Sequence, residues 1–124
     1  MKFYPVVSEL APEVVSADYK AGRAIGKACL GEQCLYFRDK LKVYYIPYAE
    51  MTRVFRRVEL IPATMCCGKG DFEVENMVIW TAEGEKAQIQ LPGERAGKIL
   101  LEELTRRAPH AEVGKPGDAE QKRE

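Results

Sequence analysis

Short runs of β-branched, aromatic and cysteine residues, separated by compact turn signals, fill the middle of the chain from residue 22 onward. This pattern predicts strands at residues 23–30, 34–38 and 42–46. The connections between them are only two to four residues long, which is too short for a crossover helix. The three strands are therefore expected to pair as an antiparallel meander.

A second group of strands follows Pro47. Residues 51–60 alternate as a strand does but carry apolar and charged side chains on both faces, which suits a barrel strand or an edge strand. Residues 72–81 form the longest predicted strand, and residues 86–91 form its hairpin partner. The segment between them, residues 61–71, is rich in turn-forming residues, and we expect an exposed loop there.

Residues 94–108 change to the period of an amphipathic helix, with apolar side chains recurring at spacings of three and four. Glu94 near the start and Arg106 and Arg107 near the end match the polarity of the helix dipole, and Pro109 ends the helix. The apolar face consists of Ala96, Ile99, Leu100, Leu104 and Ala108. The sequence predicts about four helical turns that cap the strands.

The two ends of the chain carry weaker signals. Residues 1–21 keep neither the helical nor the strand period, so we expect a lead-in with a short strand or one helical turn. Residues 109–124 combine glycine, proline and charge with few apolar side chains, and a disordered tail is expected there. Residues 1–108 thus form one domain, with a lead-in at 1–21, strands within 22–91 and a capping helix at 94–108.

Strands followed by a single helix define a mainly β protein and argue against alternating α/β architectures. We expect six or seven strands, antiparallel pairing only, and no helix between the strands. A sheet this small exposes its edges and an open end unless it curls into a barrel. A helix with one apolar stripe is suited to closing such an end, so the expected fold is a β barrel capped by the C-terminal helix.

Composition adds limits on function. The 124 residues carry 19 Lys and Arg against 19 Asp and Glu, so bulk capture of nucleic acid or of an anionic membrane is not expected. The apolar runs are too short to span a bilayer and the first residues lack the apolar core of a signal peptide, so we expect a cytoplasmic protein. The neutral total hides two opposed segments: residues 38–57 hold six basic and two acidic side chains, whereas residues 71–85 hold five acidic and no basic ones.

A family resemblance rests on three blocks within residues 34–57. They are Cys-Leu-Tyr-Phe-Arg at 34–38, Val-Tyr-Tyr-Ile-Pro-Tyr-Ala-Glu-Met at 43–51 and Val-Phe-Arg-Arg at 54–57. With the later strands and the final helix, over roughly residues 20–108, they resemble the pleckstrin-homology-like superfamily, in particular its small stand-alone bacterial members.

This resemblance implies a seven-stranded barrel of two roughly orthogonal antiparallel sheets, capped at one end by the C-terminal helix. It also implies binding of proteins, peptides or phospholipid headgroups. The lipid-binding members carry a dense basic motif between the first two strands. Residues 31–33 here, Gly-Glu-Gln, depart from that motif and speak against phosphoinositide binding.

The four cysteines are the candidates for metal or redox chemistry. Cys29, Cys34, Cys66 and Cys67 could supply four zinc ligands, but structural zinc sites use two short Cys-x2-4-Cys pairs, and adjacent cysteines do not easily point at one metal. We therefore favour reduced thiols, with Cys29 and Cys34 as small core residues, and expect no metal and no cofactor. A zinc-binding or thiol-redox protein is the alternative, and Cys67 beside Gly68 and Lys69 is the best candidate for a reactive thiol.

The candidates for an interaction surface lie on one predicted strand and just before it. They are Arg53, Phe55, Arg56, Arg57 and Tyr48. A cluster of arginines with an aromatic residue can bind an anion, a protein or an acidic lipid surface. The alternative, which we favour for the arginines, is pairing with carboxylates on neighbouring strands.

Catalysis has no recognisable signature in the sequence. His110, the only histidine, follows the capping helix without a nucleophile partner, and the Gly-Lys-Gly of residues 68–70 lacks the spacing of a phosphate loop. Trp80 is expected as a core anchor beneath the helix, with a pocket-lining role as the alternative.

The sequence therefore favours a non-enzymatic module that binds a protein or peptide, through a strand edge or the groove beside the capping helix. We expect no nucleic-acid partner and no membrane partner. Self-association through a sheet edge is an open alternative.

Overall fold

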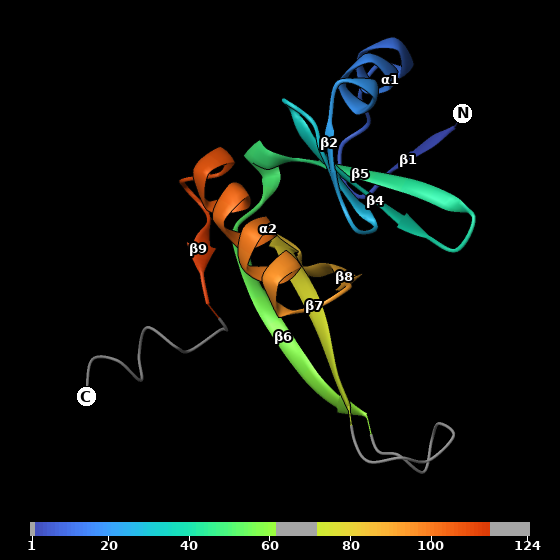
Figure 1. The fold of residues 1–124 in the computed structure, drawn as a ribbon. Coiled ribbons are helices and arrows are strands. Elements are labelled where there is room, and N and C mark those ends of the chain that lie inside the picture. The colour runs from blue at the N-terminus through green and yellow to red at the C-terminus, as the bar shows by residue number, and fades with distance from the viewer. Residues whose placement is uncertain (1, 62–71, 115–124) are drawn as a thin grey trace.

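The computed structural model describes residues 2–61 and 72–114 and arranges them as two β-sheets and two α-helices (Figure 1). The larger sheet has the strand order β1-β5-β4-β3-β2, and the smaller has the order β8-β7-β6-β9. In chain order the elements are β1 (Phe3–Pro5), α1 (Pro12–Lys20), β2 (Arg23–Ile25), β3 (Ala28–Leu30), β4 (Cys34–Asp39), β5 (Lys42–Pro47), a 3-10 turn (Tyr48–Glu50), β6 (Arg53–Ile61), β7 (Phe72–Thr81), β8 (Gly84–Leu91), α2 (Glu94–Arg107) and β9 (Glu112–Val113).

The five-stranded sheet contains the predicted meander. β4 pairs antiparallel with both β3 and β5, and Leu35 lies opposite Leu30 on one side and Ile46 on the other. The prediction of one strand over residues 23–30 is wrong, because the chain reverses at Gly26, whose φ of 59° is favourable for glycine. β2 and β3 therefore form a hairpin, and β2 becomes an edge strand.

The four-stranded sheet contains the second predicted group. β6 pairs antiparallel with β7 over nine positions, from Arg53 opposite Trp80 to Ile61 opposite Phe72. The predicted hairpin of residues 72–81 and 86–91 is confirmed, with β8 beginning two residues earlier, at Gly84. The loop that we expect between β6 and β7 lies outside the described residues.

Segments near both ends of the chain add strands that the sequence did not reveal. β1 lies parallel to β5, and β9 lies parallel to β6, so the expectation of antiparallel pairing only is wrong at these two places. β9 also corrects the prediction of a disordered tail for residues 110–114. The amides of Glu112 and Gly114 donate to the carbonyls of Thr52 and Val54, at 2.9 and 3.0 Å, and so satisfy backbone groups on the edge of β6.

Helix α1 lies between β1 and β2, so the expectation of no helix between the strands is wrong. It covers the face of the five-stranded sheet that points away from the main core (Figure 1). Val15 of α1 is 1% exposed and packs in a cluster with Tyr36 and Tyr45. Leu35 and Ile46, on the same strands but at alternate positions, belong to the main core. The sheet thus has two apolar faces, and α1 is stabilised because it buries apolar side chains against the second face.

The main core lies between the two sheets and α2. Leu100 and Leu104 of α2 are fully buried and Ala108 is 1% exposed, which confirms the predicted apolar face of this helix. The two sheets share no strand pairing among the described residues, so the expected barrel is not closed by hydrogen bonds there. Within the described part of the chain, no helix has the length and apolarity needed to cross a membrane.

Candidate functional site

The three arginines of β6 do not share one face. Side chains of a strand alternate between its two faces, so Arg56 lies opposite to Arg53 and Arg57. Each arginine has acidic partners: Arg53 with Glu112, Arg56 with Glu75 and Glu94, and Arg57 with Glu85. The hydrogen bond that Arg56 donates to the carboxylate of Glu75 raises the pKa of Arg56. The arginines are thus neutralised by neighbouring carboxylates. This is the pairing that we favoured for them from the sequence.

The two aromatic candidates are buried. Phe55 is 4% exposed, and the guanidinium of Arg57 lies 5.5 Å from the centre of its ring. Tyr48 is 5% exposed, and its hydroxyl donates a hydrogen bond of 2.7 Å to the carbonyl of Gly31. Burial raises the pKa of this hydroxyl. Neither ring offers a free face to a ligand, so both residues contribute to packing in this structure.

The two described cysteines are free thiols, Cys34 buried and Cys29 half-buried. Burial and, second, the carboxylate of Asp18 raise both pKa values, that of Cys34 to about 11. A thiol with a raised pKa stays protonated near neutral pH, which disfavours nucleophilic thiolate chemistry. In the described part of the chain, no group of three or more His, Cys, Asp or Glu residues could hold a metal ion. Cys66 and Cys67 lie outside it.

Trp80 is not beneath α2. It is half-buried and lies opposite Arg53, whereas Ile79, one position earlier, is fully buried in the main core. The prediction placed Trp80 on the strand face that packs beneath the helix, whereas Ile79, one residue earlier, occupies that face. The sequence left the phase ambiguous because apolar side chains occupy both faces here, and Val78 on the other face is also fully buried.

The basic segment of residues 38–57 and the acidic segment of residues 71–85 contact each other only in part. Arg57 reaches Glu85 at 2.9 Å across the four-stranded sheet, so charges cancel locally there. The basic residues of the β4–β5 hairpin do not take part. Arg38, Lys40 and Lys42 have no ion pair with any described residue, and neither has Lys2, which lies beside the hairpin. Leu41, at the tip, is 100% exposed.

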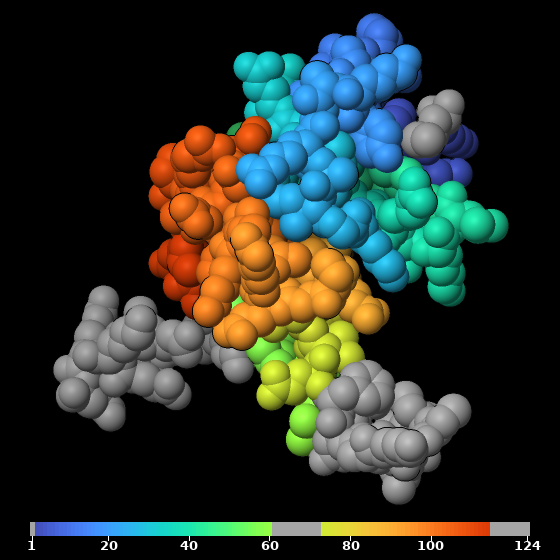
Figure 2. Space-filling view, viewed as in Figure 1, coloured from blue at the N-terminus to red at the C-terminus, as the bar shows by residue number. Residues whose placement is uncertain are grey.

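A groove of about 460 Å³ runs between the edge strand β2 and the start of α2. The groove is shallow and open to solvent along much of its surface. The space-filling view shows the surface of the β2 region, in blue, directly beside that of α2, in orange (Figure 2). The groove is lined by Arg23, Ala24, Ile25, Pro92, Gly93, Arg95, Ala96 and Ile99. Its centre is apolar and its rim carries two arginines.

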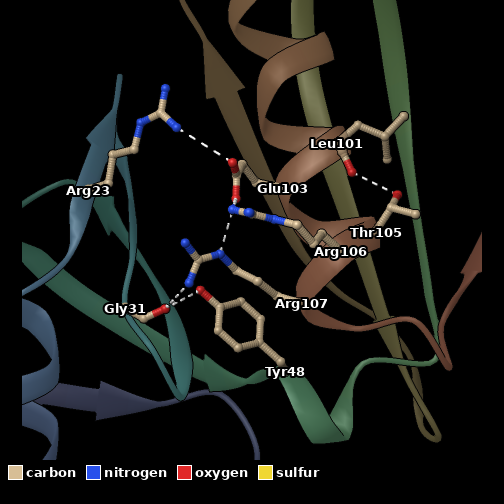
Figure 3. A network of polar contacts seen from close by, with 8 residues as sticks. All are labelled: Arg23, Gly31, Tyr48, Leu101, Glu103, Thr105, Arg106 and Arg107. Atoms are coloured by element: carbon tan, nitrogen blue, oxygen red, sulfur yellow. Dashed lines mark hydrogen bonds and ion pairs between the residues drawn. The ribbon is translucent and has the colours of Figure 1, made fainter.

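A polar network ties the two walls of this groove together (Figure 3). Arg23 of β2 lies 3.5 Å from Glu103 of α2, and Glu103 also accepts from Arg107 at 3.3 Å. Arg107 donates in turn to the Gly31 carbonyl at 2.8 Å, beside the hydroxyl of Tyr48. Hydrogen bonds from Arg106 and then Arg107 lower the pKa of Glu103. The network holds α2 at a fixed position beside β2.

Sequence reasoning anticipated a groove beside the capping helix but not its residues. Arg95 and Ile99 could be placed on α2 from the helical period alone. Arg23 could not be assigned to an edge strand, because the reversal at Gly26 was missed. The signal that could have revealed it was the Gly26-Lys27 pair, which is a hairpin turn signal.

Comparisons with known proteins found no relative that shares these features. No family model, no curated protein and no solved structure matches the chain.

Proposed function

We propose that the chain is a non-enzymatic binding module of the pleckstrin-homology-like kind, and that it holds an extended peptide in the groove between β2 and α2. The observation that carries the proposal is the position of an edge strand and a helix side by side, with an apolar groove between them.

The order of the elements supports the likeness. An antiparallel meander of β2 to β5 is followed by a second one of β6 to β8 and then by α2, which is the order that the resemblance implies. The parallel strands β1 and β9 and the helix α1 lie outside residues 22–108. We propose that the two sheets correspond to the two halves of a pleckstrin-homology-like barrel, with these terminal elements added.

The edge of β2 supports the mode of binding. β2 pairs with β3 on one side, and no described strand lies on its other side. A peptide in extended conformation can therefore add to this edge by backbone hydrogen bonds, while alternate side chains enter the apolar groove. Ala96 and Ile99 of α2 are half-buried and would contact those side chains.

Charge specifies the peptide further. Arg95 is exposed and has no ion pair with any described residue, and Arg23 keeps 60% of its side chain exposed despite its contact with Glu103. A peptide that combines apolar residues with flanking carboxylates complements this rim. The occupant that we propose is thus an acidic, partly apolar peptide segment of a protein.

Selection of random peptides by display on the immobilised chain, followed by calorimetry, tests the proposal. Arg95→Glu reverses the rim charge, and Ile99→Asp puts a carboxylate in the apolar wall. Each should lower the affinity for the selected peptides by about tenfold or more. Lys98→Glu is the matched control, because Lys98 lies on the same helix and outside the groove lining. Equal affinity of wild type and both groove variants would refute the groove as the site.

The chemistry of the two described cysteines supports a reducing compartment. Cys29 and Cys34 are free thiols whose pKa values are raised, so they are suited neither to nucleophilic attack nor to rapid disulfide exchange. Free thiols are typical of cytosolic proteins. We propose a cytoplasmic location on this ground.

A second candidate function rests on the β4–β5 hairpin. Leu41 is fully exposed at its tip, and the ammonium groups of Lys2 and Lys42 lie 5.4 and 5.0 Å from the ring of Tyr4. Around this exposed apolar tip the cations outnumber the hairpin's one carboxylate, that of Asp39, so the tip complements an anionic lipid surface, where each basic residue adds roughly 1 kcal/mol. This hairpin, rather than the arginines of β6, is the place where acidic lipid would bind.

Sedimentation with phosphatidylglycerol vesicles tests the second candidate. Binding should weaken with salt and should be lost in Leu41→Asp, whereas Val113→Asp, at another exposed apolar residue, should bind as wild type does. Absence of sedimentation at low ionic strength would eliminate it.

A further inference from the structure

Among the described residues, the outer edge of β6 has no neighbouring strand over most of its length, and this stretch is called the free edge below. β9 pairs only with Arg53 and Val54, and on the other side of the ribbon β8 accompanies β7 only from Glu75 onward. Residues 55–61 of β6 therefore face no strand on their outer side among the described residues. In Figure 1 the ends of β6 and β7 extend beyond α2 as a two-stranded arm.

This arm carries apolar side chains that nothing described covers. Val58 is 47% exposed and Leu60 is 62% exposed, on the same strand face as the buried Val54. In the space-filling view the green and yellow ends of these strands emerge below α2 (Figure 2). A two-stranded ribbon is at best marginally stable in water by itself, and an open strand edge is a template for further pairing.

The sequence of the free edge is complementary to itself. The stretch 55–61 has Val58 at its centre, with Arg57 and Glu59 immediately on either side. In an antiparallel pair centred on Val58, Arg57 lies directly opposite Glu59 of the second copy, and Glu59 lies opposite Arg57 of the second copy. Opposite charges directly across a strand pair are stabilising, and like charges there are destabilising.

Neighbouring registers do not share this property. A pair centred on Glu59 would place two carboxylates opposite each other, and one centred on Arg57 would do the same with two guanidinium groups. The two side chains already stand on one face of the sheet, because both bind Gln88: its amide nitrogen donates to Glu59 at 3.0 Å, and Arg57 donates to its oxygen at 2.9 Å. Charge therefore selects the register centred on Val58.

We propose that two copies of this chain associate through the free edge of β6, antiparallel and about a two-fold axis at Val58. The two four-stranded sheets join into one continuous sheet across the axis, and Val58 of each copy contacts Val58 of the other. Such an isologous contact closes on itself and stops at the dimer. It uses no residue of the groove between β2 and α2, so it is independent of the proposed peptide binding.

Analytical ultracentrifugation of the full chain from micromolar to millimolar concentration tests this proposal. The wild type should sediment as a monomer and dimer in equilibrium, whereas Glu59→Arg and Arg57→Glu, each alone, should remain monomeric at concentrations where the wild type is dimeric. An equimolar mixture of the two variants should again form a dimer, because every residue 57 then faces a residue 59 of opposite charge.

Val58→Lys keeps the test decisive if Arg57→Glu fails to fold, since Arg57 also binds Glu85. The lysine puts two ammonium groups at the axis and should abolish the dimer, whereas Leu41→Lys, at a fully exposed residue of another hairpin, should leave it unchanged. The proposal would be overturned by a wild type that is monomeric at millimolar concentration or that forms an open-ended assembly. It would also be overturned if Glu59→Arg or Val58→Lys dimerised as the wild type does, or if a mixture of the two folded charge variants stayed monomeric.

Discussion

The carboxylate of Asp18 accepts a hydrogen bond of 2.8 Å from the hydroxyl of Tyr36. The same carboxylate accepts the backbone amides of Glu32, Gln33 and Cys34, at 2.7, 3.2 and 3.1 Å. Asp18 therefore joins α1 to the turn between β3 and β4 and to the buried ring of Tyr36. This turn also supplies the Gly31 carbonyl that receives Arg107 of α2, so Asp18 supports the network beside the groove.

Asp18→Ala should lower the free energy of unfolding by about 2–4 kcal/mol, because three amides and one buried hydroxyl lose a charged acceptor. Glu13→Ala is the matched control, since Glu13 is an exposed carboxylate on the same helix. Urea denaturation followed by circular dichroism measures both. A loss no larger for Asp18→Ala than for Glu13→Ala would contradict the role of Asp18.

Gly31→Ala should be destabilising because of space rather than backbone conformation. A Cβ atom at this position would lie 2.3 Å from an oxygen of Asp18 and 2.8 Å from the ring of Tyr36. We expect a loss of about 1–3 kcal/mol in the wild type and a smaller loss in the Asp18→Ala background, where one obstacle is absent. A double-mutant cycle by urea denaturation gives the coupling, and strict additivity would show that the two residues do not meet in this way.

Tyr48→Phe should cost about 1 kcal/mol, because the Gly31 carbonyl loses one donor but keeps Arg107 at 2.8 Å. Tyr44→Phe provides the comparison, since Tyr44 is a half-buried tyrosine of the adjacent β5 whose hydroxyl makes no side-chain hydrogen bond to a described residue. Thermal and urea unfolding of both variants measure the difference. Equal stability of the two variants would argue against the Tyr48 hydrogen bond.

The stability of the fold should decline in alkali through Cys34. Burial favours the neutral thiol and raises its pKa from 9.0 to about 11. Between these values the unfolded chain has released the proton while the folded chain still holds it, so stability falls as the pH rises. Below pH 9 this contribution is fully present.

Cys34→Ala tests this effect, because it removes the titrating thiol. The stability advantage of the wild type over Cys34→Ala should be larger at about pH 8 than at about pH 11, as measured by urea denaturation. An advantage that does not change with pH would mean that the Cys34 thiol titrates normally in the folded chain.

The elements with a clear period could be predicted from the sequence, and those that depend on a partner surface could not. The helical spacing of Leu100 and Leu104 and the short turns around β4 and β5 specify local structure and therefore located α2 and the meander. Helix α1 has no strong period of its own and forms against Tyr36 and Tyr45. β9 is two residues long and exists through backbone hydrogen bonds to β6, which no side-chain pattern records.

The candidate site shows the same division. The arginines of β6 were visible as a cluster in the sequence, but the register with β7 and β8 decides that Arg56 meets Glu75 and Arg57 meets Glu85. The groove joins Ile25 and Ile99, which are far apart in the chain. Such a juxtaposition follows from tertiary packing and is not encoded in any local spacing.

The central claim is that the groove between β2 and α2 binds a peptide, and chemical-shift mapping of the 15N-labelled chain tests it most directly. On titration with a display-selected acidic peptide, the amides of Ala24, Ile25, Arg95, Ala96 and Ile99 should shift together and saturate with one dissociation constant. Amides of the β4–β5 hairpin and of the β6 edge should stay in place. Shifts confined to either of those regions, with the groove amides unchanged, would contradict the account.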